Sequence, residues 1–188
     1  MDIAVICENS GALSSAFRKA GHTVTSCDFE ASASPGLHYK GNCLDILPGS
    51  FDLVVGFPPC QFLAKAQMFR YHKEPQRVIE RDKAVEFVKE LYHRCPRIAL
   101  ENPVGYLNTH WKNPTQIVYP WMFGDPYRKE ICWWLKDVPP LLATLINPIR
   151  KSISNHTNSR MNQAERSKIR SSWSYYPLMC EAIANQWS

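Results

Sequence analysis

The sequence lacks the features that mark membrane, secreted and zinc-binding proteins. No apolar run approaches the ~20 residues that span a bilayer, and Met1-Asp2-Ile3 leads into a strand-like segment without a signal peptide. The seven cysteines are odd in number, scattered, and without a C-x-x-C pair, which argues against a disulfide framework or a zinc site. We therefore expect no membrane partner, no metal, and a reducing cytoplasm as the location.

The G-x-G-x-x-G pattern of dinucleotide-binding sheets is also absent, which disfavours a dinucleotide ligand. Hydrophobic residues make up 45% of the chain and charged residues 21%, as in ordinary globular proteins. The 188 residues are enough for a sizeable core. We expect residues 1–188 to form one domain.

The net charge of +5 is concentrated in one window, residues 150–170. Glu165 is the single acid there, against six basic residues, which are Arg150, Lys151, Arg160, Arg166, Lys168 and Arg170. Such a window favours a polyanionic partner such as nucleic acid. A basic segment that is merely solvated is the alternative, and the sequence leaves both open.

The chain opens with a pattern that predicts a strand, a helix and a second strand, at residues 3–7, 12–20 and 23–27. This is the usual start of a doubly wound nucleotide-binding sheet. The turn from Glu8 to Gly11 would present N–H groups at a helix N-terminus, where an anionic or carboxylate group can sit. Asp28, at the end of the second strand, is placed to bind ribose hydroxyls, although any tight turn and strand-end acid would give the same pattern.

The remaining chain alternates strands and helices, which predicts an α/β fold with a mostly parallel sheet and helices on both faces. The predicted strands lie at 37–43, 51–56, 97–101, 115–121 and 130–135, and the predicted helices at 77–94 and 176–187. Residues 62–75 show no clear period, and we expect them to form a loop over the site.

A cysteine stands just beyond the strand predicted at 51–56. Pro58 and Pro59 end that strand because proline cannot donate to a sheet ladder. Cys60 follows, at the strand end where ligands collect in an open α/β sheet. A thiol there is suited to nucleophilic attack; the alternative is a buried cysteine that fills space.

A carboxylate closes the strand predicted at 97–101. Strand–helix–strand order makes this strand a plausible neighbour of the one before Cys60, with both carboxyl ends at one edge of the sheet. Glu101 would then face the same pocket as Cys60. A helix N-cap or an ion-pair partner is the other role open to it.

The order Pro58-Pro59-Cys60-Gln61, then Glu101-Asn102-Pro103, resembles the DNA (cytosine-5)-methyltransferases. The resemblance covers most of the chain and is closest to the short versions encoded by phages and prophages. It implies a single-domain, Rossmann-like methyltransferase fold and the cytoplasm of a bacterial host. Amino-group methyltransferases instead place Asp, Asn or Ser where Phe57 stands.

The resemblance also implies a cofactor, S-adenosylmethionine. Residues 7–21 align without gaps to the family's first motif, but of its three glycines only Gly11 remains. Asp28 matches the acid for the cofactor's ribose, and Asn42 stands where an acid usually contacts the adenine amino group. The full set of residues implied to bind the cofactor is Cys7, Glu8, Asn9, Ser10, Gly11, Asp28, Phe29, Asn42 and Pro58.

The reaction that the resemblance implies is methylation of cytosine at C5. Attack of the Cys60 thiolate at C6 would make C5 nucleophilic, and a protonated Glu101 would donate to N3. Arg128 or Lys129, in a degraded form of the family's Gln-x-Arg-x-Arg motif, would hold the cytosine carbonyl or a phosphate. The base must be flipped out or already single-stranded. Nucleic acid would meet Gln61 and four residues of the basic window, which are Arg160, Arg166, Lys168 and Arg170.

The family's large target-recognition domain has no counterpart, and residues 137–172, a short loop and a basic segment, stand in its place. Specificity would be loose, or would come from loops, a protein partner or a homo-oligomer. Three functions stay open. The chain methylates cytosine in DNA; it performs the same chemistry on single-stranded DNA, RNA or a free cytidine nucleotide; or it is a non-catalytic module that binds nucleic acid or a partner, as the lost glycines suggest.

Overall fold

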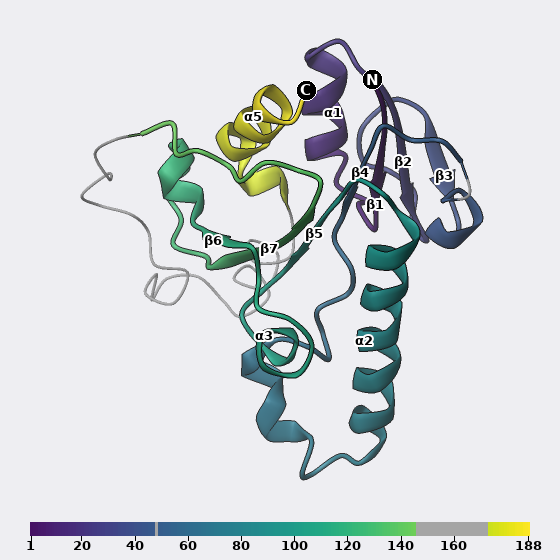
Figure 1. Cartoon of the computed structure of the whole chain (residues 1–188), viewed down its shortest axis with the longest axis vertical. Helices are drawn as coiled ribbons and strands as arrows, with labels where there is room; N and C mark the ends of the chain where they lie inside the picture. The colour runs from purple at the N-terminus through teal and green to yellow at the C-terminus, as the bar shows by residue number, and fades with distance from the viewer. Residues whose placement is uncertain (48, 146–172) are drawn as a thin grey trace.

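The computed structural model describes residues 1–47, 49–145 and 173–188 (Figure 1). The whole basic window, residues 150–170, with Arg160, Arg166, Lys168 and Arg170, lies outside the described residues. Its predicted contact with nucleic acid therefore stays a prediction.

Seven strands form one sheet in the order β3-β2-β1-β4-β5-β7-β6. The strands are β1 (Asp2–Ile6), β2 (Thr23–Asp28), β3 (His38–Lys40), β4 (Leu53–Gly56), β5 (Ile98–Asn102), β6 (Gln116–Val118) and β7 (Ile131–Lys136). The first five strands in the sheet pair in parallel, whereas β7 pairs antiparallel with both β5 and β6. The predicted α/β class with a mostly parallel sheet is confirmed.

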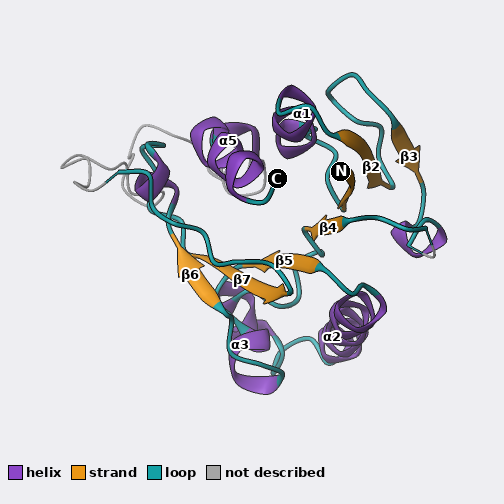
Figure 2. Cartoon of the chain, turned by 45° about the horizontal axis from the view of Figure 1, so that its top comes forward, coloured by secondary structure: helices purple, strands orange, loops and turns teal. Residues whose placement is uncertain are grey.

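Helices cover both faces of the sheet (Figure 2). α1 (Ala12–Lys19) and α5 (Pro177–Gln186) pack on one face, and α2 (Gln76–Arg94) and α3 (Tyr106–His110) on the other. Strand side chains alternate between these two layers, so that Val5 contributes to the first core and Ile6 to the second. Within the described residues, no helix combines the length and the apolar character needed to cross a membrane.

Two predicted strands are shorter than expected. The strand predicted at 37–43 is only His38–Lys40, and a 3₁₀ helix follows it at Cys43–Asp45, which Asn42 caps by accepting from the Leu44 N–H at 3.1 Å. The strand predicted at 115–121 ends at Val118, because Pro120 begins another 3₁₀ helix, Pro120–Phe123. α3 was not predicted, since five residues are too few to show a helical period.

Residues 62–75 are more ordered than the predicted loop. They include a 3₁₀ helix, Lys65–Arg70, and Ala64 forms a β-bridge with Gly105 just ahead of α3. The Lys65 N–H donates to the Val104 carbonyl at 3.1 Å, and the Tyr106 N–H donates to the Leu63 carbonyl at 2.7 Å. The segment that follows Cys60 is therefore tied to the segment that follows β5.

Gly105 makes this bridge possible. A Cβ atom at this position would lie 2.0 Å from the Leu63 carbonyl oxygen, a backbone atom that cannot swing away. We expect Gly105→Ala to lower the free energy of unfolding by about 1–3 kcal/mol, measured by chemical denaturation. Gly21→Ala is the control, because its Cβ would meet nothing within 4 Å and only its left-handed backbone should cost about 1 kcal/mol. A smaller loss at Gly105 than at Gly21 would contradict the close contact.

Candidate active site

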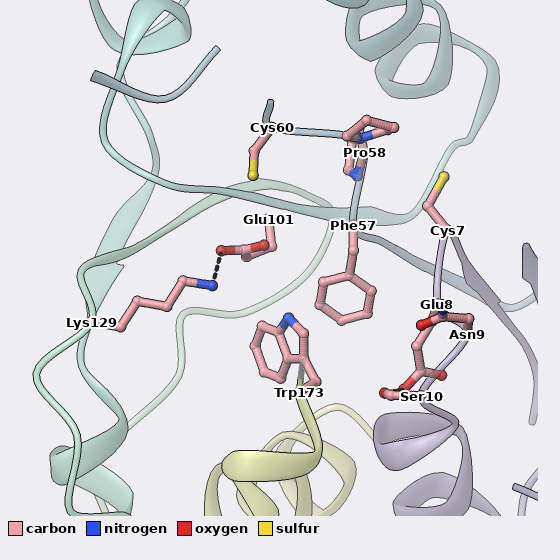
Figure 3. A pocket seen from close by; sticks show the side chains of 11 residues that line it. Cys7, Glu8, Asn9, Ser10, Phe57, Pro58, Cys60, Glu101, Lys129 and Trp173 are labelled. Atoms are coloured by element: carbon pink, nitrogen blue, oxygen red, sulfur yellow. Dashed lines mark hydrogen bonds and ion pairs between the residues drawn. The ribbon is translucent and has the colours of Figure 1, made fainter. Parts of the chain in front are cut away.

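A pocket lies where the strand order reverses. From the adjacent pair β1 and β4, the chain builds outward through β2 and β3 on one side and through β5, β7 and β6 on the other. Ligands of open α/β sheets bind at such a switch point, beyond the carboxyl ends of the strands. The loops after β1 and β4 here surround a cavity of about 180 Å³ (Figure 3), lined by Cys7, Glu8, Asn9, Ser10, Phe57, Pro58, Pro59, Cys60, Glu101, Lys129 and Trp173.

Cys60 is held in a tight turn after the two prolines. The N–H groups of Leu63 and Ala64 both donate to its carbonyl oxygen at 3.0 Å. All seven cysteines lie in the described ranges; Cys60 is exposed, Cys7 is half-buried and the other five are buried. Figure 3 shows the Cys60 sulfur directed toward Glu101. The alternative of a buried, space-filling Cys60 is therefore wrong.

Glu101 and Lys129 face each other across the pocket. Glu101 is 6% exposed, and its Oε1 lies 3.5 Å from Lys129 Nζ. This oxygen accepts no hydrogen bond from the residues that the structure describes. The pairing thus combines both roles weighed for Glu101, an ion-pair partner and a group facing the pocket of Cys60.

The structure distinguishes between the two basic residues that the sequence left open. Lys129 lines the cavity, whereas Arg128 is exposed and does not line it. Lys129 immediately precedes Glu130 and β7, the strand that pairs with β5, and its ammonium reaches Glu101 in this way.

The environment of Cys60 favours its neutral thiol. Burial of the sulfur raises its pKa, the Glu101 carboxylate raises it further, and the Lys129 ammonium lowers it. The residue as a whole is exposed, and its sulfur is directed toward Glu101, which also lines the pocket (Figure 3). Formation of the nucleophilic thiolate therefore requires a proton acceptor or a pH above neutrality.

This environment predicts the pH dependence of Cys60 alkylation. Because only the thiolate reacts with iodoacetamide, the rate should rise with pH to a midpoint above the ordinary thiol value of about 8.5. Glu101→Gln should lower this midpoint and Lys129→Gln should raise it, since the two charges act in opposite directions. The measurement is mass spectrometry of the Cys60 peptide after timed labelling. A midpoint below about 8 in the unaltered protein would contradict the assigned environment.

Asn102 fastens the loop that carries Cys60. Its side-chain amide donates to the Pro58 carbonyl oxygen at 2.9 Å, and Asn102 is 1% exposed. This bond crosses from β5 to the loop after β4. The two sequence motifs, Pro58 to Gln61 and Glu101 to Pro103, are thus held together directly.

The N-terminus of α1 already holds a carboxylate, and it belongs to the chain itself. The Leu13 N–H donates to Glu8 Oε1 at 2.8 Å, the Ser14 N–H donates to Oε2 at 3.4 Å, and the Ser10 and Ser14 hydroxyls donate as well. Glu8 is 3% exposed. A carboxylate group was expected at these N–H groups, and the one that occupies them is the Glu8 side chain of the chain itself.

Gly11 supports the same turn with a left-handed φ of 66°. A Cβ atom here would lie 2.4 Å from the Ser34 Cβ, because residues 32–34 cross over the turn. The Ala33 N–H donates to the Asn9 carbonyl at 2.7 Å, and the Asn9 amide donates to Glu30 at 2.7 Å. The glycine kept from the family motif therefore has a steric reason of its own.

The other residues expected to bind a cofactor do not line the cavity. Asp28 is the last residue of β2 and Phe29 follows it. The Glu30 N–H donates to Asp28 Oδ1 at 2.9 Å, and Phe29 is 73% exposed. Asn42 uses its side-chain oxygen as the cap described above, so it would meet a ligand mainly as a donor. Gln61 is exposed beside the cavity, and its carbonyl accepts from Arg77 at 3.1 Å.

Sequence reasoning missed the aromatic wall of the pocket, formed by Phe57 and Trp173. Their ring centroids lie 4.6 Å apart. Trp173 begins a 3₁₀ helix, Trp173–Tyr175, just ahead of α5, and no motif singled it out. An aromatic residue close to the predicted closing helix was the only available signal.

No three His, Cys, Asp or Glu side chains gather as metal ligands in the part of the chain that the structure describes. No protein-family model and no curated protein matches this chain. The interpretation of the site therefore depends on its own chemistry and on the motif resemblance.

Proposed function

We propose that this protein methylates cytosine at C5 in DNA, using S-adenosylmethionine and a covalent adduct at Cys60. One observation carries the proposal. The thiol of Cys60, the carboxylate of Glu101 and the ammonium of Lys129 come from three separate stretches and line one cavity. Packing of the core does not require a nucleophile, an acid–base group and a cation to lie together. Their meeting at the switch point of the sheet, where ligands bind in such folds, therefore supports a catalytic role.

Each group has a role that its chemistry suits. The Cys60 thiolate would add to C6 of the ring, which makes C5 a nucleophile that takes the methyl group. Loss of the C5 proton to a base would then expel the Cys60 thiolate and restore the ring. Glu101 would face the N3 edge of the base, where negative charge develops, and exchange a proton there. Lys129 would stabilise the carbonyl oxygen beside N3, and its pairing with Glu101 keeps both groups at the same edge of the base.

The chain's residues fit S-adenosylmethionine at some positions and not at others. When bound, this cofactor supplies an electrophilic methyl group. Glu8, Phe57 and Trp173 line the cavity and suit a cation. Asp28 ends the neighbouring strand β2, and the exposed Phe29 follows it. The cofactor's carboxylate would need donors other than the Leu13 and Ser14 N–H groups.

The occupied α1 N-terminus favours a second candidate, a non-catalytic module that binds nucleic acid or a partner. A site whose anion position is filled by Glu8 needs no cofactor to be complete. The two candidates differ in one property, since only an enzyme transfers a methyl group.

The test is transfer of labelled methyl from S-adenosylmethionine to duplex DNA, single-stranded DNA, RNA and free dCMP, offered side by side. We expect label on cytosine C5 in DNA. Label on RNA or dCMP alone would support cytosine methylation as the reaction but would show that DNA is not the substrate. Absence of label from all four, together with absent cofactor binding in calorimetry, would leave the binding module.

A further inference from the structure

The aromatic wall of the cavity is fixed in place from behind. Phe57 and Trp173 meet at 4.6 Å with their planes tilted by 48°. Trp133 packs against Trp173 at 5.8 Å, and Tyr176 meets it edge-on at 5.9 Å. Two further side chains thus hold the indole, so a ligand would meet a rigid aromatic wall.

The charges of the described residues that line the cavity sum to a negative value. Its thiols are neutral near pH 7, because contact with Cys43 and burial raise the pKa of Cys7 and burial raises that of Cys60. Lys129 is the one cation among the described lining residues, and it pairs with Glu101. The carboxylate of Glu8 remains, so the described lining residues carry one excess negative charge.

The donors that hold Glu8 do not cancel this charge. They are N–H groups and hydroxyls, which are neutral. Arg18 is close enough to feel the charge of Glu8. Its guanidinium, however, donates to the carbonyls of Pro35, Val24 and Leu37, outside the cavity lining.

A sulfonium is a cation that has no N–H or O–H to donate. Ordinary hydrogen bonds to an acceptor therefore cannot hold it. It can be recognised by the negative face of an aromatic ring or by the field of a carboxylate. The cavity offers both, from Phe57 and Trp173 on one wall and from Glu8 on another.

We propose that Trp173, together with Phe57 and the field of Glu8, forms a sulfonium site that selects the charged cofactor over its neutral product. The assignment rests on the proposed function, and it adds a specificity-determining residue that no sequence motif contains. The aromatic wall would discriminate between the two ligands by charge. The product S-adenosylhomocysteine differs from S-adenosylmethionine only in lacking the methyl group and the positive charge at sulfur.

The test is calorimetric affinity for S-adenosylmethionine and for S-adenosylhomocysteine, measured on the whole chain. Trp173→Leu removes the aromatic face, and we expect it to weaken binding of the sulfonium form roughly 3- to 30-fold while changing binding of the thioether form less than about 2-fold. Trp173→Phe keeps a ring and should retain most of the preference. Trp111→Leu is the matched control, because this indole packs on Trp134 in the opposite core layer.

Equal weakening of both ligands by Trp173→Leu would overturn the sulfonium site and leave the proposed function intact, since the wall would then act by shape alone. If the unaltered protein binds neither ligand, the sulfonium site and the proposed function both fail. Should circular dichroism show Trp173→Leu unfolded, Phe57→Leu provides the same comparison, with the same selective loss expected at this half-buried position.

Discussion

Replacing Cys60 with alanine should abolish methyl transfer to cytosine, with a loss on the order of 10³-fold or more. The reason is chemical, because C5 of cytosine becomes nucleophilic only after a nucleophile has added to C6. The replacement removes one sulfur atom of an exposed residue that lines the cavity, so the free energy of unfolding should change by less than about 0.5 kcal/mol. The measurement is label on cytosine C5 in the most active substrate.

Cys95→Ala is the control for this experiment, because Cys95 is a buried thiol that follows α2 and does not line the cavity. It should leave the rate per folded molecule unchanged. A second readout is the covalent adduct, which a cytosine analogue blocked at C5 should trap on the Cys60 peptide. Transfer that persists in Cys60→Ala would exclude the covalent route.

Glu101→Gln should lower methyl transfer by about 10²- to 10⁴-fold, the range of a general acid–base group. Glutamine preserves the shape but cannot exchange a proton with N3, and it leaves the Lys129 ammonium without its carboxylate partner. We expect the free energy of unfolding to fall by only about 1–3 kcal/mol, because one buried partner of a polar pair is replaced by a neutral group. Rate and stability should therefore change to very different degrees.

Glu130→Gln is the control for the loss of one negative charge. Glu130 is an exposed carboxylate next to Lys129 in the sequence, and it accepts a hydrogen bond from the Tyr119 hydroxyl. This variant should keep nearly full activity. If Glu101→Gln and Glu130→Gln reduce the rate equally, the effect would come from a general loss of negative charge, and the specific role of Glu101 would be refuted.

The sequence predicted the parts of the site that follow strand ends. Cys60 and Glu101 could be placed because continuous apolar runs predict the strands, two prolines mark where the strand before Cys60 stops, and parallel strands share one edge. The choice between Arg128 and Lys129 was beyond reach, since neighbouring residues point in different directions and the start of β7 decides which enters the cavity.

Contacts between distant segments were not predictable in the same way. The sequence placed Glu8 in the turn before α1 but did not show that its carboxylate also caps this helix, through bonds that reach up to six residues along the chain. Trp173 lies more than a hundred residues from Phe57 in the sequence, and their contact depends on how α5 packs onto the face that holds α1. α3 is too short to show a helical period.

The bond from Asn102 to Pro58 limits how this protein can vary. Its acceptor is a main-chain carbonyl, so no substitution at position 58 can move or replace it. A substitution of Asn102 that removes the donor therefore cannot be compensated by a substitution at position 58. In a hydrogen bond between two side chains, by contrast, both residues can change together. Only a residue with a donor of the same reach can succeed Asn102, and aspartate, which has nearly the same shape, would bring two acceptors face to face. Position 58 can therefore change its side chain without losing this acceptor, whereas position 102 is restricted to residues that supply the donor.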